Sequence, residues 1–177
     1  MYWLGIDIGS ISTDLVVMDS SFDIVEKLYL RTRGKPLEAV KEGMEILGRS
    51  FEDKDIGGAG LTGSGRALGA ALVGADVVKN EITAHARAAA FIDPEIHTVI
   101  EIGGQDSKLI VMKYGFVEDF AMNTVCAAGT GSFLDRQAER MGISVDEMGR
   151  MAAEAGKYVT IAGRCAVFAE SDIIHKQ

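Results

Sequence analysis

The sequence has 177 residues, of which 47% are hydrophobic, and a formal net charge of −8 at pH 7. A chain of this length buries roughly 70% of the surface that its unfolded form exposes, which is enough for one domain or two small lobes. The negative charge argues against nucleic acid and anionic membranes as partners, because neither attracts an acidic protein.

Three strands and three helices are predicted before residue 94. Apolar runs predict strands over Tyr2–Ile8, 13–18 and Ile24–Arg31, with a turn at Gly9-Ser10. Pro36 opens a helix that ends near Gly48, because apolar residues recur there at helical spacing. Alanine-rich helices are predicted over 66–72 and 81–91, the second ending before Pro94.

A glycine-rich stretch over residues 58–63 fits the dinucleotide pattern G-x-G-x-x-G. The preceding residues 51–55 are polar, and no clear helix opens on the last glycine. We therefore do not interpret this stretch as a dinucleotide site.

The opening pattern recurs after a shift of 94 residues. Asp7-Ile-Gly9 then aligns with Glu101-Ile-Gly103, and residues 15–18 align with 109–112 without a gap. Thr13 meets Ser107 in the same alignment. We interpret the chain as a duplicated unit of strand, turn, strand, strand and helix, with one lobe over 1–94 and a second over 95–177.

Each repeat predicts a phosphate-binding turn. A strand that ends in a carboxylate and turns on glycine lets backbone N–H groups approach phosphate oxygens, since no side chain intervenes. Because bare carboxylates repel phosphates, we expect Mg²⁺ between Asp7, Glu101 and the phosphate groups of a polyphosphate. The pattern G-x-x-x-x-G-K-[ST] is absent, so the predicted nucleotide site is not a P-loop.

The chain has two cysteines, Cys126 and Cys165, each predicted at or just before the N-terminus of a helix. A strand-like run over 158–162 precedes Cys165, and the helix after it is expected to carry Val167, Phe168 and Ile173 inward. The positive end of a helix favours a thiolate, which is the form that binds metals.

Two interpretations of these cysteines stay open. Composition alone favours small apolar core residues. The alanines and the Gly129-Thr-Gly131 segment beside Cys126 leave space near the sulfur instead of filling a core. One chain cannot complete a zinc site, and a cubane iron–sulfur cluster takes four thiolates. That ligand count predicts a homodimer with a shared cluster.

Several motifs together resemble one family. They are Asp7-Ile-Gly-Ser10, Gly63-Ser-Gly-Arg66, Glu101-Ile-Gly-Gly-Gln-Asp106, Asn123-Thr-Val-Cys-Ala-Ala-Gly-Thr-Gly131 and Cys165-Ala-Val-Phe-Ala-Glu-Ser171. The whole chain resembles the BadF/BadG/BcrA/BcrD ATPase family, and within it the activators of 2-hydroxyacyl-CoA dehydratases and benzoyl-CoA reductases.

This resemblance implies an ATP-hydrolysing homodimer with one 4Fe-4S cluster, held by Cys126 and Cys165 of each chain. Such activators accept an electron from ferredoxin or flavodoxin and pass it at low potential to the dehydratase or reductase. The implied site residues fall into two groups. Asp7, Glu101 and Gln105 would hold Mg²⁺ and orient water, and the phosphate-binding residues would be Gly9, Ser10, Ser12, Thr13, Gly103, Gly104, Asp106 and Lys108.

The predicted fold class is α/β, a duplicated ribonuclease H-like fold of the actin, hexokinase and sugar-kinase superfamily. Two departures from the family pattern matter. A lysine is common five residues after the first-turn glycine, where this chain has Asp14, whereas the repeat equivalent Lys108 keeps the charge. No Gly-Gly pair follows Gly104, so we expect a second lobe truncated at its C-terminus, without the adenosine-binding section.

Two alternatives remain beside the activator. A small-molecule kinase of the same superfamily would need a catalytic carboxylate and has no use for paired cysteines. A non-catalytic cluster-binding or dimerisation fragment would explain the missing section. The first residues lack the basic segment of a signal peptide, and no apolar run approaches about 18 residues, so we expect a cytoplasmic protein.

Overall fold

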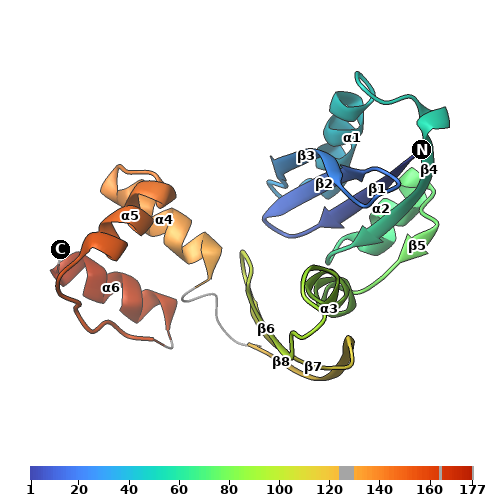
Figure 1. Ribbon diagram of the computed structural model, residues 1–177. Coiled ribbons are helices and arrows are strands. Elements are labelled where there is room, and N and C mark those ends of the chain that lie inside the picture. Colours follow the sequence, from blue (N-terminus) through green and yellow to red (C-terminus); the bar gives the residue numbers. More distant parts are fainter. Residues whose placement is uncertain (124–129, 164, 177) are drawn as a thin grey trace. The chain divides into compact units, whose positions relative to one another are not determined.

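The computed structural model describes residues 1–123, 130–163 and 165–176 (Figure 1). The chain divides into two compact units, one formed by Met1–Val99 and Ile110–Asp119, the other by Ile100–Leu109 and Phe120–Gln177. The strands are β1 (Tyr2–Ile8), β2 (Ser12–Met18), β3 (Ile24–Arg31), β4 (Ile56–Thr62), β5 (Val77–Val78), β6 (Thr98–Ile102), β7 (Ser107–Lys113) and β8 (Phe116–Met122). The helices are α1 (Pro36–Leu47), α2 (Arg66–Val73), α3 (Glu81–Ile92), α4 (Gly131–Met141), α5 (Val145–Glu154) and α6 (Ala166–Lys176), with a 3-10 turn at Asp53–Asp55.

A five-stranded sheet organises the first unit, in the order β3-β2-β1-β4-β5. The strands β1, β2 and β3 are antiparallel neighbours, whereas β4 runs parallel to β1 and β5 parallel to β4. The helices α1 and α2 lie beside this sheet in Figure 1. The three predicted strands and the predicted helix from Pro36 are confirmed.

Alternation along β1 and β2 separates an apolar face from a polar one. Ile6 and Ile8 of β1 and Leu15 of β2 are buried in one core. Helix α1 approaches the sheet closely at Gly43, since a Cβ on this residue would lie only 2.5 Å from Leu15 Cδ1 of β2. Side chains of a strand alternate between faces, so Asp7 lies on the opposite face from its buried neighbours.

The stretch 58–63, which fits G-x-G-x-x-G, lies mostly in β4, between β1 and β5. A helix does open soon after its last glycine, because α2 begins at Arg66. The absence of side chains at Gly58 and Gly60 fits the close approach of Trp3 and of β5. This stretch therefore serves as a central strand of the sheet.

A three-stranded sheet has the order β6-β7-β8. Ile110 and Met112 of β7 form a buried cluster with Ala86 of α3, and α3 lies beside this sheet in Figure 1. Small alanine side chains on α3 allow this close packing, as the sequence predicted.

The second unit contains α4, α5 and α6 (Figure 1). Gly142 ends α4 in the left-handed conformation, with φ 71°, and Ser144 caps α5 by accepting a hydrogen bond from the Glu147 N–H over 3.1 Å. Such caps satisfy N–H and C=O groups that a helix end leaves unpaired.

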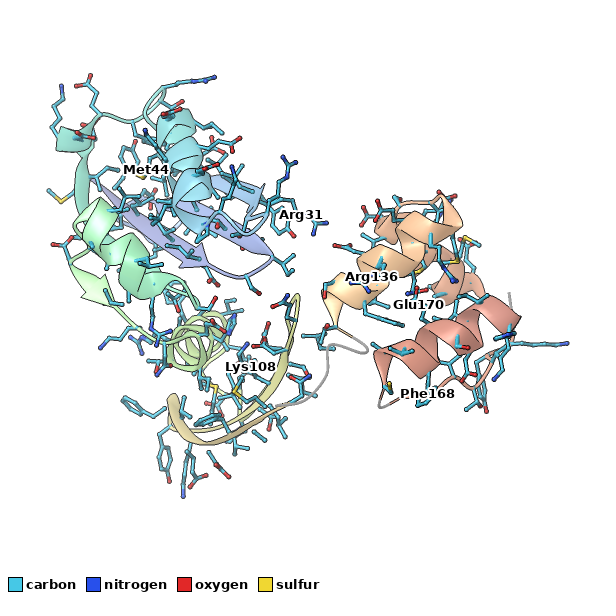
Figure 2. All side chains as sticks on the ribbon, turned by 180° about the vertical axis from the view of Figure 1, so that it is seen from behind. Arg31, Met44, Lys108, Arg136, Phe168 and Glu170 are labelled. Atoms are coloured by element: carbon cyan, nitrogen blue, oxygen red, sulfur yellow. The ribbon has the colours of Figure 1, made fainter. Side chains whose placement is uncertain are left out.

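Two expectations for the C-terminal region were wrong. Residues 158–162 form no strand, because Ala162 N–H bonds to the Asp172 side chain over 2.9 Å instead of to a neighbouring strand. Val167 and Phe168 are 70% and 67% exposed, and Ala169 is the buried residue of α6. Figure 2 labels Phe168 on this helix.

Within the described residues, no helix combines the length and the apolar character that crossing a membrane requires.

Candidate functional site

The turn between β1 and β2 is closed by one backbone hydrogen bond. Gly9 donates its N–H to the carbonyl oxygen of Ser12 over 2.8 Å. A Cβ at Gly9 would lie 2.9 Å from that oxygen, so the tight turn requires glycine. Within the part of the chain that the structure describes, the backbone N–H groups of Ser10 and Ile11 make no hydrogen bond. They are donors available to an anion at the tip of the turn.

Thr32 holds this turn from the end of β3. Its hydroxyl donates to the carbonyl oxygen of Gly9 over 2.9 Å and lies 3.0 Å from the Thr13 hydroxyl, and its N–H donates to Ile11 over 2.9 Å. Thr13 and Thr32 are both buried. That Thr13 binds phosphate stays a prediction; in the structure its side chain is buried and contacts the Thr32 hydroxyl behind the turn.

The end of β4 packs against Asp7. Gly63 has φ 90°, and a Cβ there would collide with Asp7 Oδ1 and with the backbone of Ile8. Gly65 donates its N–H to the Ile8 carbonyl over 2.8 Å, and the guanidinium of Arg66 donates to the Gly63 carbonyl over 3.0 Å. The Gly63–Arg66 motif therefore positions the carboxylate end of β1.

The turn between β6 and β7 repeats the first turn at the predicted shift. Gly103 donates its N–H to the carbonyl oxygen of Asp106 over 2.8 Å, the same bond at the same length as Gly9 to Ser12. Within the described residues, the N–H groups of Gly104 and Gln105 make no hydrogen bond, as at the first turn. The Gln105 side chain is exposed.

The charges around the two turns differ. Lys108 Nζ lies 2.9 Å from Glu101 Oε2 and 2.7 Å from Asp106 Oδ1, with its side chain 4% exposed (Figure 2). At the equivalent place in the first turn, Asp14 accepts a hydrogen bond from the Ser12 hydroxyl over 2.9 Å. Burial raises the pKa of Asp14, and the bond from Ser12 acts in the opposite direction.

These contacts bear on two predicted phosphate ligands. The Ser12 hydroxyl donates a hydrogen bond to Asp14 Oδ2 over 2.9 Å. The Lys108 ammonium is engaged by two carboxylates of its own turn. Both residues shape their turns in the structure.

The second turn is bonded to the start of α4. Gly131 N–H donates to the Gly103 carbonyl over 2.9 Å, and Ser132 N–H donates to the Gly104 carbonyl over the same distance. A Cβ at Gly131 would lie 3.3 Å from the Gly103 oxygen, so glycine allows this contact. Gly131 and Ser132 are thus bonded to the turn that carries Gly104 and Gln105.

Of the two cysteines, the structure describes only Cys165. Cys165 is half-buried just before α6, and its carbonyl accepts the N–H of Ala169 over 2.9 Å, as the prediction of a helix N-terminus requires. Cys126 lies outside the described residues. Among the residues described, no three His, Cys, Asp or Glu side chains gather into a metal-binding group.

The predicted site residues belong to two separate sets. Asp7, Gly9, Ser10, Ser12 and Thr13 lie in the first unit, and the second set lies in the other unit. This second set comprises Glu101, Gly103, Gly104, Gln105, Asp106 and Lys108. Thr32, directly after β3, was missed, because only the pairing of β3 with β2 brings it to the first turn.

Comparisons with known proteins agree with this geometry. The (R)-2-hydroxyglutaryl-CoA dehydratase activating ATPase of Acidaminococcus fermentans is 38% identical over 98% of this chain and 66% of its own length. The activator of lactoyl-CoA dehydratase of Anaerotignum propionicum is 38% identical over 98% of this chain and 67% of its own length. The chain thus spans about two thirds of the length of these relatives.

Solved structures show the same fold. The activator of 2-hydroxyisocaproyl-CoA dehydratase from Clostridium difficile with bound ADPNP matches with a TM-score of 0.85 and 36% identity, over 99% of this chain and 65% of that one. A putative N-acetylmannosamine kinase from Listeria monocytogenes, 15% identical over 88% of this chain and 72% of that one, matches in fold alone, with a TM-score of 0.52. This chain therefore shares its α/β fold with both solved structures. Residues 4–177 match the BadF/BadG/BcrA/BcrD ATPase family, and the chain belongs to that family.

Proposed function

We propose that this chain binds the phosphates of ATP and an iron–sulfur cluster and acts as an ATP-dependent activator that delivers a low-potential electron to a 2-hydroxyacyl-CoA dehydratase or benzoyl-CoA reductase. Ferredoxin or flavodoxin is the proposed electron donor. The observation that carries the proposal is the pair of identically closed turns, Gly9–Ser12 and Gly103–Asp106, each with two N–H groups that remain open in the described residues. Named activator relatives of similar sequence support the choice of partner.

Both turns fit a phosphate chain. A Cβ at Gly9 would lie 2.9 Å from the Ser12 carbonyl oxygen, and a Cβ at Gly103 would lie 2.9 Å from Glu101 Oε1 and 3.3 Å from the Asp106 carbonyl oxygen, so both tight turns favour glycine. Open N–H groups at the tip donate to phosphate oxygens, as in other backbone anion sites. We propose that Gly9, Ser10, Gly103 and Gly104 bind the phosphates in this way.

The carboxylates fit a hard cation. Asp7 and Glu101 are each the last residue but one of their strands, two residues before the glycine of the turn, and carboxylate oxygens suit Mg²⁺. Lys108 holds Glu101 and Asp106 in place through two ion pairs. The exposed Gln105 side chain has an amide that can orient an attacking water by donating and accepting hydrogen bonds. Hydrolysis would then depend on position and charge, as phosphoryl transfer requires.

The two thiols of each chain fit half the ligand set of a cubane cluster, which supplies one-electron transfer when bound. We propose that Cys126 and Cys165 provide this half and that a second copy of the chain provides the rest. Cys165 lies directly before α6, at the N-terminus of that helix.

A calorimetric titration of the 177-residue chain with Mg-ATP, Mg-GTP and Mg-tripolyphosphate tests the proposal. Because the proposed ligands of both turns contact phosphate groups and not the base, we expect roughly millimolar binding with little preference among the three ligands. Asp7→Asn is expected to weaken the binding of all three compounds, because it removes a carboxylate ligand of the proposed Mg²⁺. No binding by the wild-type chain, or equal binding by Asp7→Asn, would contradict the proposal.

A further inference from the structure

The first turn lacks the lysine that its repeat equivalent has. In the second turn, two carboxylates, Glu101 and Asp106, surround one ammonium group, Lys108. In the first turn the equivalent positions are Asp7, Ser12 and Asp14, which bring two carboxylates and no cation. The two acidic residues are direct neighbours across the sheet, because Asp7 pairs with Asp14 in the register of β1 and β2.

The adjacent strand β3 carries a cationic residue, Arg31, close to these carboxylates. In the register of β2 and β3, Arg31 pairs with Ser12, and Tyr29 pairs with Asp14. Directly paired residues of antiparallel strands point to the same face, with Cα atoms about 5 Å apart. Arg31 therefore lies on the face that carries Ser12, Asp14 and Asp7. Its guanidinium carbon lies 6.0 Å from the centre of the Tyr29 ring, at the edge of the range for a cation–π contact.

A cavity adjoins the same residues. Its volume is about 540 Å³, and its lining includes Arg31, Thr32 and Lys35. Thr32 bonds to Gly9 and Ile11, so the cavity wall is also the support of the first turn. Figure 2 labels Arg31, the last residue of β3.

We propose that Arg31 is the cation of the first phosphate turn and that its guanidinium binds the phosphate chain of the nucleotide held at Gly9–Ser12. This inference rests on the proposed function, since it names a further ligand of the same nucleotide. With Arg31 included, the first turn carries two carboxylates and one cation, as the second turn does.

Physical chemistry favours this arrangement over a turn without a cationic side chain. Beside Asp7, where Mg²⁺ is proposed, Asp14 brings a second carboxylate close to the phosphate groups, and the N–H groups of Ser10 and Ile11 carry no net charge to balance it. A guanidinium stays protonated and presents a planar set of donors that matches phosphate oxygens in pairs. Since its Cα lies beside Ser12, the long Arg31 side chain can reach the tip of the turn.

Arg31→Gln tests the proposal in the full 177-residue chain, with Mg-tripolyphosphate as the probe and calorimetry as the readout. Loss of a charge-assisted contact should weaken binding about tenfold to a hundredfold. Lys27→Gln is the matched control: it removes a cation from the same strand and the same face, and it pairs with Val16, away from the turn. Circular dichroism checks that each variant is folded.

The double variant Asp14→Lys/Arg31→Gln gives the sharpest test. It places a lysine where the second turn has Lys108, and it should recover binding relative to Arg31→Gln alone. Equal binding by Arg31→Gln and Lys27→Gln, or no recovery in the double variant, would overturn the assignment of Arg31 while leaving the proposed function intact. No binding by the wild-type chain would overturn both.

Discussion

Lys108 Nζ lies 2.9 Å from Glu101 Oε2, beside the turn between β6 and β7, and the lysine side chain is 4% exposed. A buried ammonium without its carboxylate partners, or the reverse, is strongly unfavourable. We predict that Lys108→Met lowers the free energy of unfolding by about 3 kcal/mol, measured by urea denaturation, because Glu101 and Asp106 lose their counter-ion.

Lys113→Met is the control for this prediction, since Lys113 lies on the same strand and forms an exposed ion pair with Glu118 over 3.6 Å. Exposed pairs contribute less than about 1 kcal/mol. Similar losses for the two variants would show that Lys108 is no more than a surface charge.

Gly63→Ala should destabilise the first unit and weaken phosphate binding. The residue has φ 90°, and the added methyl group would collide with Asp7 Oδ1 and the Ile8 backbone. Gly74→Ala provides the comparison, because Gly74 has φ 71° with nothing within 4 Å of a Cβ. That variant should lose only about 1–2 kcal/mol through the left-handed backbone. If thermal unfolding of the two variants coincides, the Gly63–Asp7 contact is not a constraint.

Asp14→Asn should stabilise the protein at neutral pH. Burial raises the pKa of Asp14 above its ordinary 3.8, and the Ser12 hydrogen bond opposes this effect. The folded state therefore loses stability, relative to the unfolded chain, as the pH rises from about the ordinary value through the raised pKa. The asparagine variant avoids that loss and still accepts the bond from Ser12.

Unfolding midpoints at pH 3 and pH 7 measure this effect, and the advantage of Asp14→Asn should vanish at the lower pH, where both forms of the site are neutral. Ser20→Ala, a change of an exposed polar residue after β2, should show no such pH dependence. A constant difference between wild type and Asp14→Asn at both pH values would contradict the assignment.

Protein purified without oxygen should be brown and contain about four iron atoms per dimer. Cys126→Ser and Cys165→Ser should each remove the colour, because either loss leaves two thiolates for a cluster that needs four. Ala166→Ser, next to Cys165, should keep it. Iron analysis and the visible spectrum decide the matter, and a colourless wild-type monomer after anaerobic reconstitution would contradict the shared cluster.

Much of the fold was predictable from local patterns. The strands at Tyr2–Ile8 and Ile24–Arg31 and the helix from Pro36 follow from apolar runs, spacing and proline preference, all of which act within a few residues. The repeat of Asp7-Ile-Gly9 at Glu101-Ile-Gly103 also predicted the matching turns, because a short turn closed by one glycine is a local structure.

Other features depended on which segments meet in space. Register alone places Arg31 beside Ser12, and the parallel pairing of β4 with β1 brings Gly63 against Asp7, fifty-six residues away. The tertiary structure also decided that Val167 and Phe168 are exposed and Ala169 is buried, since helical spacing does not say which face meets the rest of the chain. The sequence by itself determined the two carboxylate–glycine turns, which are local structures. Tertiary contacts decided which charged side chains surround those turns, because burial and strand pairing bring together residues that are far apart in the sequence.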